Sequence, residues 1–282
     1  MKKQVFRVNS DGFNGAWYLA PVKSSRGLII MLGDSSEDHM ARTGAKWLHE
    51  QGLHVMAMIK VMWLVMGGAV KASLPVLGIS DPETFWKEAK KIYRREMDRL
   101  PEYGPNDILK VNLAHAVMLS AVYEACDPKP DIDALTKFYR EFFLRQRIII
   151  AALKKRDMLK PSEVKRQIAI SERSQNATHP FTWQFKVQVK DENRYTAVFT
   201  RCGIYDYLNS RGMAHIAPAM CAIDYTFGEC SNHWFLREST IATGGEVCDC
   251  RYVSKKASTS EEIRRSKENK RAEAIRGGRK EF

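Results

Sequence analysis

The run Trp183-Gln184-Phe185-Lys186-Val187-Gln188-Val189-Lys190 decides the fold class of this 282-residue chain. Its aromatic and aliphatic side chains alternate with Gln and Lys, which is the two-residue period of a strand with one buried face. Asp191-Glu192-Asn193 then turns the chain into a partner strand over residues 194–201. A strand that pairs with its sequence neighbour through a short turn predicts an antiparallel sheet.

The residues before this hairpin predict helices. Ser80-Asp81-Pro82-Glu83 combines a capping side chain, a proline in the first turn and an early acid, and it starts a helix that runs to about residue 100. Further helices are expected over residues 107–126 and 131–158, and a short fourth helix starts at residue 161. We therefore expect an α+β fold, with a helical front half followed by an antiparallel sheet of hairpins.

The residues after the first hairpin predict short inserted helices and a second hairpin. The helices are expected at about residues 204–210 and 214–227. The second hairpin is expected to pair residues 236–242 with residues 246–253 around Gly244-Gly245.

Both faces of this second hairpin carry polar groups. In the register set by a two-residue loop, Thr240 lies opposite Asp249 on one face, while Arg237 and Cys248 share the other face. Two interpretations stay open, a hairpin that forms part of a polar site and an exposed hairpin with cross-strand ion pairs.

Residues 1–60 predict strands around one helix, in the order β-β-β-α-β, a small β-α-β-like segment. Residues 13–21, the apolar run 27–33 and the stretch 45–55 resemble the start of an α/β-hydrolase. An active enzyme of that fold needs a nucleophile in a G-x-S-x-G elbow, which this sequence does not contain. We expect residues 1–60 to be a truncated α/β-hydrolase-like segment, and residues 61–79 to connect it to the main domain.

The charge and the hydropathy of the sequence limit the classes of partner that the protein is expected to bind. Lys and Arg number 45 against 33 Asp and Glu, a formal net charge of +12 that favours anionic partners. The strand-rich part from residue 182 to residue 253 contains no recognised nucleic-acid-binding motif, and the basic residues are spread over residues 137–173 and the tail, so no nucleic-acid partner is expected. Residues 61–79 are apolar but include Lys71 and three glycines, so they predict a connector rather than a membrane span, and no membrane partner is expected.

The two ends of the chain carry further information. The N-terminus has no apolar signal core and the chain has 6 cysteines, which favours reduced thiols in the cytoplasm. Residues 254–282 contain ten Lys or Arg against five Glu and almost no large apolar residue. They predict a basic, disordered tail that could form at most a solvated helix over residues 261–275.

Five of the six cysteines fall between residues 202 and 250. They contain no C-x2-C pair, and the two thiols of Cys248 and Cys250 would lie roughly 7 Å apart on one strand face, which is loose for one metal ion. No metal and no cofactor are therefore expected. Two alternatives stay open for these cysteines: they are buried thiols that serve only packing, or they form a zinc site.

Cys221 and Asp224 lie three residues apart in an expected helix, so they share one helical face. A thiol beside a carboxylate suits acid–base or nucleophilic chemistry on a small polar substrate. The alternative is a buried cysteine next to an aspartate that caps a helix end.

A series of motifs runs from Cys202-Gly203-Ile204-Tyr205 through Cys221-Ala222-Ile223-Asp224 and residues 235–245 to Cys248-Asp249-Cys250. In order and spacing, this series resembles the L-2-amino-thiazoline-4-carboxylic acid hydrolase family. The family pattern has a Cys near a Tyr, then C-x2-D, then R-x2-T-(L/I)-x2-G, then C-D followed by an aromatic residue. This chain departs from it with Cys250 at the aromatic position. The resemblance covers roughly residues 80–253, which we expect to form one α+β domain.

The resemblance implies a hydrolase that opens a carbon–nitrogen bond of a cyclic amidine, in a small thiazoline-carboxylate-like substrate. On chemical grounds, Asp224 is the candidate base, and Cys221 or Cys248 would donate a proton or attack covalently. Arg237 would bind the substrate carboxylate, because guanidinium groups pair with carboxylates through two hydrogen bonds. Cys202 is the second candidate substrate-binding residue, and all five side chains are expected to converge on one pocket.

A small-molecule substrate is thus the expected partner, and a homo-oligomer is left open. The alternative function is a non-enzymatic sensor domain of the same fold that binds a small ligand or a metal.

Overall fold

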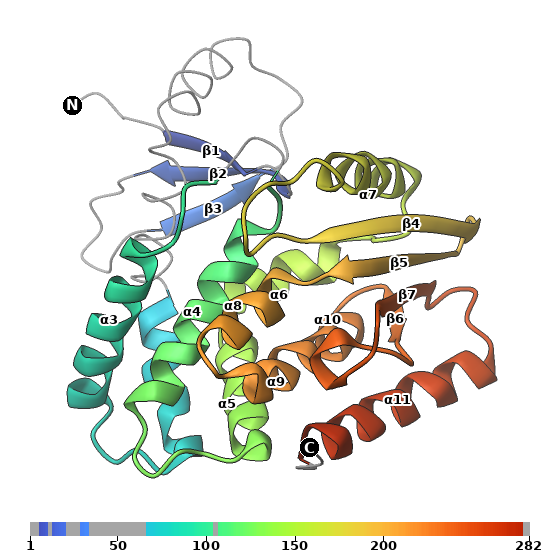
Figure 1. Cartoon of the computed structure of the whole chain (residues 1–282). Coiled ribbons are helices and arrows are strands. Elements are labelled where there is room, and N and C mark those ends of the chain that lie inside the picture. Colours follow the sequence, from blue (N-terminus) through green and yellow to red (C-terminus); the bar gives the residue numbers. More distant parts are fainter. Residues whose placement is uncertain (1–5, 11–12, 21–28, 34–65, 104–106, 279–282) are drawn as a thin grey trace. The chain divides into compact units, whose positions relative to one another are not determined.

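A computed structural model of the chain describes residues 6–10, 13–20, 29–33, 66–103 and 107–278 (Figure 1). The chain divides into two compact units, residues 1–65 and residues 66–282. The boundary lies inside the stretch 61–79 that was expected to be a connector, and residues 66–73 of that stretch are helical.

The described part of the first unit is a three-stranded antiparallel sheet. Its strands are β1 (Phe6–Ser10), β2 (Phe13–Ala20) and β3 (Ile29–Gly33), in the order β1-β2-β3. These are the three strands expected from the sequence. The helix and the last strand of the expected β-β-β-α-β order lie outside the described residues, so the α/β-hydrolase-like origin of this segment stays a prediction.

The second unit begins with helices, as expected for the helical front half. Asp81 caps the first long helix, because its carboxylate accepts a hydrogen bond from the backbone N–H of Thr84 at 3.1 Å. The elements are η1 (Leu74–Leu77), α3 (Pro82–Asp98), α4 (Lys110–Ala125), α5 (Ile132–Leu144), α6 (Arg147–Lys155) and α7 (Pro161–Ser174).

The prediction of a single helix over residues 131–158 is wrong. Helix α5 ends at Leu144 and α6 begins at Arg147, with Gln146 in a non-helical conformation at ψ 72°. Three polar residues at 145–147 interrupt the apolar stripe. Because of this interruption, the apolar residues on either side can bury separate faces.

A four-stranded antiparallel sheet follows, with the strand order β4-β5-β7-β6. Its strands are β4 (Gln184–Asp191), β5 (Arg194–Arg201), β6 (His233–Leu236) and β7 (Cys248–Ser254). Helix α7 packs against the edge strand β4, at the edge of the sheet opposite β6 (Figure 1). The α+β fold class, with its antiparallel sheet after a helical front half, is confirmed.

Short helices connect β5 to β6. They are α8 (Gly203–Ser210), η2 (Ala214–Ile216), α9 (Ala217–Cys221) and α10 (Ile223–Cys230). The helix expected over residues 214–227 is therefore divided, and Ala222 separates α9 from α10.

The register expected for the second hairpin is wrong by two residues. Leu236 lies opposite Arg251, where Glu238 was expected, and the pairing with β7 ends there. The carboxylate of Asp249 accepts hydrogen bonds from the backbone N–H groups of Glu238 and Ser239 at 2.9 and 2.7 Å. These bonds replace the strand ladder, so residues 237–247 form a loop that contains η3 (Ile241–Thr243).

The C-terminal residues were expected to form at most a solvated helix, and the structure has a helix there that contacts the rest of the second unit. Helix α11 (Ser260–Gly278) packs against β6, and the hydroxyl of Ser266 donates to the carbonyl of Phe235 at 2.7 Å. The carboxylate of Glu262 accepts a 2.7 Å bond from Arg194 on β5. Polar side chains hold this helix in place. A sequence analysis that looks for apolar core residues does not detect such contacts.

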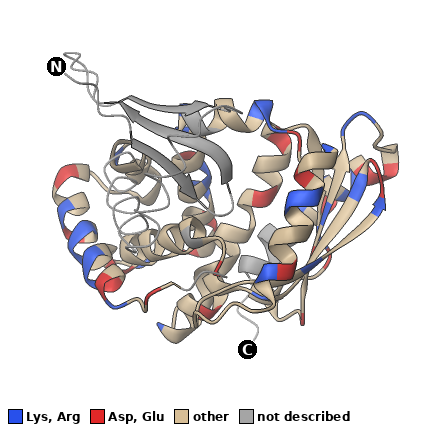
Figure 2. Ribbon diagram, turned by 90° about the horizontal axis from the view of Figure 1, so that it is seen from above, with Lys and Arg blue, Asp and Glu red and all other residues tan. Residues whose placement is uncertain are grey.

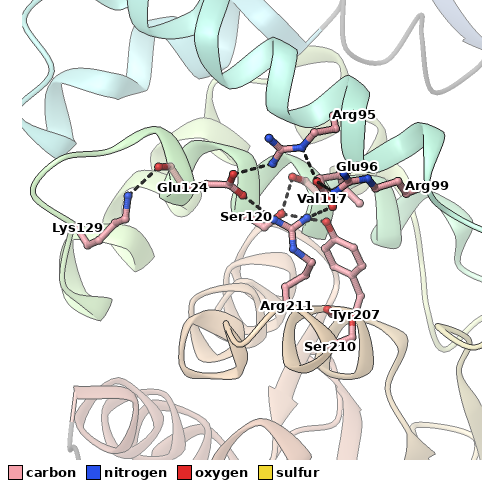
Figure 3. Close-up of polar contacts among 10 residues, drawn as sticks. All are labelled: Arg95, Glu96, Arg99, Val117, Ser120, Glu124, Lys129, Tyr207, Ser210 and Arg211. Atoms are coloured by element: carbon pink, nitrogen blue, oxygen red, sulfur yellow. Dashed lines mark hydrogen bonds and ion pairs between the residues drawn. The ribbon is translucent and has the colours of Figure 1, made fainter.

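Helices α3, α4 and α8 are joined by a cluster of charged side chains (Figure 3). Glu96 of α3 is 4% exposed and pairs with Arg95 at 2.8 Å, with Arg99 at 3.1 Å and with Arg211. Glu124 of α4 pairs with Arg95 at 2.7 Å and with Arg211 at 2.6 Å. Because Arg211 directly follows α8, this cluster fixes the helix that begins beside Cys202.

Lys and Arg are interspersed with Asp and Glu along the described helices and strands (Figure 2). No described helix is long and apolar enough to cross a membrane.

Candidate functional site

The centre of the candidate site is an ion pair between Arg237, which follows β6, and Asp224 in the first turn of α10. Nη1 of Arg237 lies 2.8 Å from Oδ2 of Asp224. The arginine side chain is 2% exposed, whereas that of the aspartate is 39% exposed. Nη2 of Arg237 donates to the backbone carbonyl of Cys221 at 2.9 Å. Arg237 therefore holds both the carboxylate and the end of α9 in place.

Two aromatic rings surround the buried guanidinium. Its Cζ atom lies 5.1 Å from the ring centroid of Phe235 and 5.8 Å from that of Tyr225. A buried cation is costly unless it is paired, and the carboxylate and the two ring faces reduce that cost. Nη1 also lies 3.9 Å from the sulfur of Cys250, which links the ion pair to strand β7.

Two thiols lie on either side of one hydroxyl group. Oγ1 of Thr240 is 3.3 Å from Sγ of Cys248 and 3.9 Å from Sγ of Cys221. The backbone N–H of Ile241 donates to Sγ of Cys248 at 3.3 Å. Thr240 is 2% exposed and Cys248 is 7% exposed. These contacts hold the Cys248 sulfur in one orientation, next to the hydroxyl that it shares with Cys221.

Cys202 and Cys250 complete the group of thiols. Burial raises the pKa of Cys202 to about 12, and the neighbouring Cys248 contributes to the rise. The backbone N–H groups of Ile204 and Tyr205, at the start of α8, bond to the Cys202 sulfur and partly offset this effect. Burial also raises the pKa of Cys250 well above its usual range. Both groups are therefore uncharged thiols at neutral pH.

The start of α8 is packed too tightly for a side chain beside Cys202. A Cβ atom on Gly203 would lie 2.3 Å from the carbonyl oxygen of Phe181. Glycine at this position therefore lets the α8 backbone approach residue 181 and sets where the Cys202 thiol lies.

A histidine–tyrosine pair lies behind the site. Nδ1 of His115 on α4 is 3.0 Å from the hydroxyl of Tyr139 on α5. Burial lowers the pKa of His115 to about 4, so this imidazole is neutral at neutral pH. Burial raises the pKa of Tyr139, and the charges of Asp224 and Cys221 raise it further. Sequence reasoning missed this pair, because both residues lie among apolar neighbours and are typical of a helix core.

The structure groups the five residues predicted from the sequence. Asp224 and Arg237 are in direct contact, Cys221 and Cys248 share Thr240, and Cys202 is close enough to Cys248 for that thiol to affect its pKa. Their roles stay predictions.

The expected hairpin register put Thr240 on the face opposite Arg237 and Cys248 and so away from the site, and this placement is wrong. It followed from the hairpin register, and the strand pairing ends before residue 240. Asp249 does lie outside the site, where it bonds to the loop backbone and to Arg251 at 2.7 Å.

A surface hollow of about 300 Å³ lies over the loop that carries Thr240. It is lined by Glu238, Ser239, Thr240, Thr243, Gly244 and Gly245. Thr240 thus lines the hollow and also contacts the two thiols. Among the residues that the structure describes, no group of three or more His, Cys, Asp or Glu side chains could hold a metal ion.

Comparison with known proteins gives one family. The sequence model of the family described as L-2-amino-thiazoline-4-carboxylic acid hydrolase matches residues 111–252, which is half of the chain. The matched range runs from α4 to β7 and contains all five predicted site residues. No curated protein and no solved structure matches the chain.

Proposed function

Because the chain belongs to the L-2-amino-thiazoline-4-carboxylic acid hydrolase family, we propose that it hydrolyses a carbon–nitrogen bond of a cyclic amidine that carries a carboxylate. The observation that supports this reaction best is the contact of the Arg237–Asp224 pair with Cys221, whose thiol shares Thr240 with Cys248. A base and two thiols within one group of contacts are the parts that such a reaction needs.

Asp224 is the proposed general base. The buried Arg237 keeps a positive charge beside one carboxylate oxygen, which favours the ionised form. The side chain is 39% exposed, so a water molecule can reach it. In the proposed reaction, Asp224 takes a proton from this water as the water oxygen attacks the carbon of the ring C=N bond, either directly or after a thiol has added to it.

Cys221 and Cys248 supply the second reactive group. A thiol next to the ring can attack the C=N carbon or donate a proton to the departing nitrogen. Cys202, with its pKa raised to about 12 by burial, stays uncharged and contributes an S–H group to the wall of the binding site.

Arg237 was predicted to bind the substrate carboxylate directly. Its 2% exposure and its bonds to Asp224 and to the carbonyl of Cys221 favour a positioning role, in which it acts through Asp224. A direct bond to the substrate would require the pair with Asp224 to open.

The test is turnover of 2-amino-thiazoline-4-carboxylate by the full chain, followed by mass spectrometry of the product. The expected product has gained the mass of one water molecule. Asp224→Asn is expected to lower the rate by about 10²–10⁴, the usual contribution of a general base. Cys230→Ser, at the end of α10 and outside the site contacts, is the matched control and should keep the wild-type rate. A wild-type rate equal to the rate without protein would overturn the proposed function.

A further inference from the structure

The two thiols beside Thr240 differ in what else they contact. The sulfur of Cys248 accepts a hydrogen bond from the backbone N–H of Ile241 at 3.3 Å. The backbone carbonyl of Cys221 is held by Arg237, while its sulfur reaches Thr240 at 3.9 Å. Cys248 is 7% exposed, and Cys221 is more accessible. Packing therefore favours Cys221 as the thiol that a reagent reaches first.

The hydroxyl of Thr240 is held in place by its own backbone. Its carbonyl accepts hydrogen bonds from the N–H groups of Thr243 at 3.1 Å and Gly245 at 3.0 Å. A Cβ atom on Gly245 would lie 2.3 Å from Oγ of Ser239, so the loop closes tightly at this point. Because the hydroxyl group has one proton, it can donate to only one of the two sulfurs at a time, and its lone pairs can accept from the other.

We propose that Thr240 is a positioning residue that gives the two thiols different roles. The S–H of Cys221 donates to Oγ1 of Thr240, and the O–H of Thr240 donates to the sulfur of Cys248. The bond from the N–H of Ile241 supports this direction, because it already makes the Cys248 sulfur an acceptor. Two donors directed at one sulfur make Cys248 the reactive thiol and leave Cys221 as the proton donor.

The reaction in which the two thiols are used rests on the proposed function, whereas the difference between the two thiols does not. There, the Cys248 thiol adds across the C=N bond, so that sulfur bonds to carbon and nitrogen gains one proton. Cys221 protonates the ring nitrogen as the C–N bond breaks. Asp224 then takes one proton from water as the water oxygen attacks the same carbon, and it passes this proton to Cys221. The second water proton goes to the sulfur that the oxygen displaces, which returns Cys248 as a thiol. The sequence consumes one water molecule and needs no other reactant.

The test measures alkylation of the folded full chain by iodoacetamide at about pH 7.5, with each cysteine followed by peptide mass spectrometry. Cys248 is expected to react faster than Cys221, although Cys221 is more exposed. Thr240→Val removes the hydroxyl and keeps the side-chain shape, and it should lower the ratio of the two rates about tenfold or more. Thr240→Ser keeps the hydroxyl and should hold the ratio within about twofold of wild type.

Thr182→Val is the matched control. Thr182 is 1% exposed, and its hydroxyl has no hydrogen-bond partner among the described residues. This variant should leave the ratio unchanged, which separates loss of a buried hydroxyl in general from loss of the one at residue 240.

Three results would overturn the proposal. They are faster labelling of Cys221 than of Cys248 in the wild type, a rate ratio that survives Thr240→Val, and labelling of Cys230 while Cys248 stays unmodified. The readout is independent of turnover. A chain that labels as expected but does not open the thiazoline ring contradicts the proposed function and leaves the roles of the two thiols intact.

Discussion

Arg237 and Asp224 form an asymmetric ion pair, in which the cation is 2% exposed and the carboxylate is 39% exposed. The two partners are therefore not equivalent. Removing the carboxylate leaves a buried positive charge without its counter-ion, which is costly in free energy. The same asymmetry leaves the carboxylate within reach of solvent, where the proposed base has to meet water.

Asp224→Asn is expected to lower the free energy of unfolding by about 2 kcal/mol. This is less than the loss for a fully buried pair, because the carboxylate is partly screened by solvent. Urea unfolding followed by circular dichroism measures the change. Asp98→Asn, at an exposed site at the end of α3, should shift the value by less than about 0.5 kcal/mol. Equal effects of the two substitutions would show that the pair does not stabilise the fold.

Glu96→Gln is expected to destabilise the fold more strongly, by about 3 kcal/mol, because Glu96 is buried among three arginines. Its carboxylate is 4% exposed and neutralises part of the charge of Arg95, Arg99 and Arg211. The matched substitution is Glu88→Gln on the same helix, where the side chain is 56% exposed, and it should cost less than about 0.5 kcal/mol. Thermal unfolding of both variants checks this, and a Glu96→Gln protein as stable as wild type would contradict it.

Gly203→Ala is expected to cost about 1–3 kcal/mol, because the added methyl group meets the carbonyl of Phe181. Gly68→Ala is expected to raise the free energy of unfolding instead. Gly68 lies in the helical stretch 66–73, and a Cβ atom added there would have open space within 4 Å, so alanine should stabilise the chain by up to about 1 kcal/mol. Chemical unfolding compares the two, and equal shifts would be inconsistent with the close approach at α8.

Acid is expected to destabilise the protein through His233. Burial, with the charges of Lys255 and Arg156, lowers the pKa of His233 from its ordinary value of 6.5 to about 3. Below pH 6.5 the unfolded chain therefore binds a proton that the folded chain does not, and stability falls as pH decreases. The loss reaches about 3 kcal/mol near pH 4.

His233→Gln should lower the slope of the stability profile between about pH 6.5 and 4.5, whatever its effect at neutral pH. The slope should not vanish, because burial also lowers the pKa of His115 to about 4 and that histidine acts in the same range. Glu163 adds little to the slope in this range, because its carboxyl is largely ionised in both the folded and the unfolded chain above its ordinary pKa of 4.5. Burial would raise the folded pKa, but Arg166 and Arg156 lower it to about 2, so the loss of stability from Glu163 falls mainly below pH 4.5. Urea titrations at several pH values measure the slope. An unchanged slope in the variant would assign the acid sensitivity to other groups.

Local sequence patterns predicted much of this fold. The alternation over residues 183–190 predicted β4 and its partner, and the Asp81-Pro82 cap predicted the start of α3. Both patterns act through neighbours in the chain, so no tertiary information was needed. The division between α5 and α6 was missed, because a helix break without Gly or Pro depends on what each half packs against.

The candidate site shows the same limit. Cys221, Asp224, Arg237 and Cys248 stood out by residue type and spacing. Thr240 did not, because its position depends on Asp249 ending the strand pairing, and side-chain bonds to a loop backbone leave no periodic pattern. Register arguments assume that strand pairing continues to the turn, and here it stops at Leu236.

The most direct test of the account compares Cys248→Ser with Cys230→Ser in the hydrolysis of 2-amino-thiazoline-4-carboxylate. Serine keeps the size of the side chain and a bond to Thr240, but it is a much weaker nucleophile than a thiol at neutral pH. The account predicts that kcat/KM falls by about 10² or more for Cys248→Ser and stays within about twofold of wild type for Cys230→Ser. A Cys248→Ser enzyme that retains wild-type kcat/KM would contradict it.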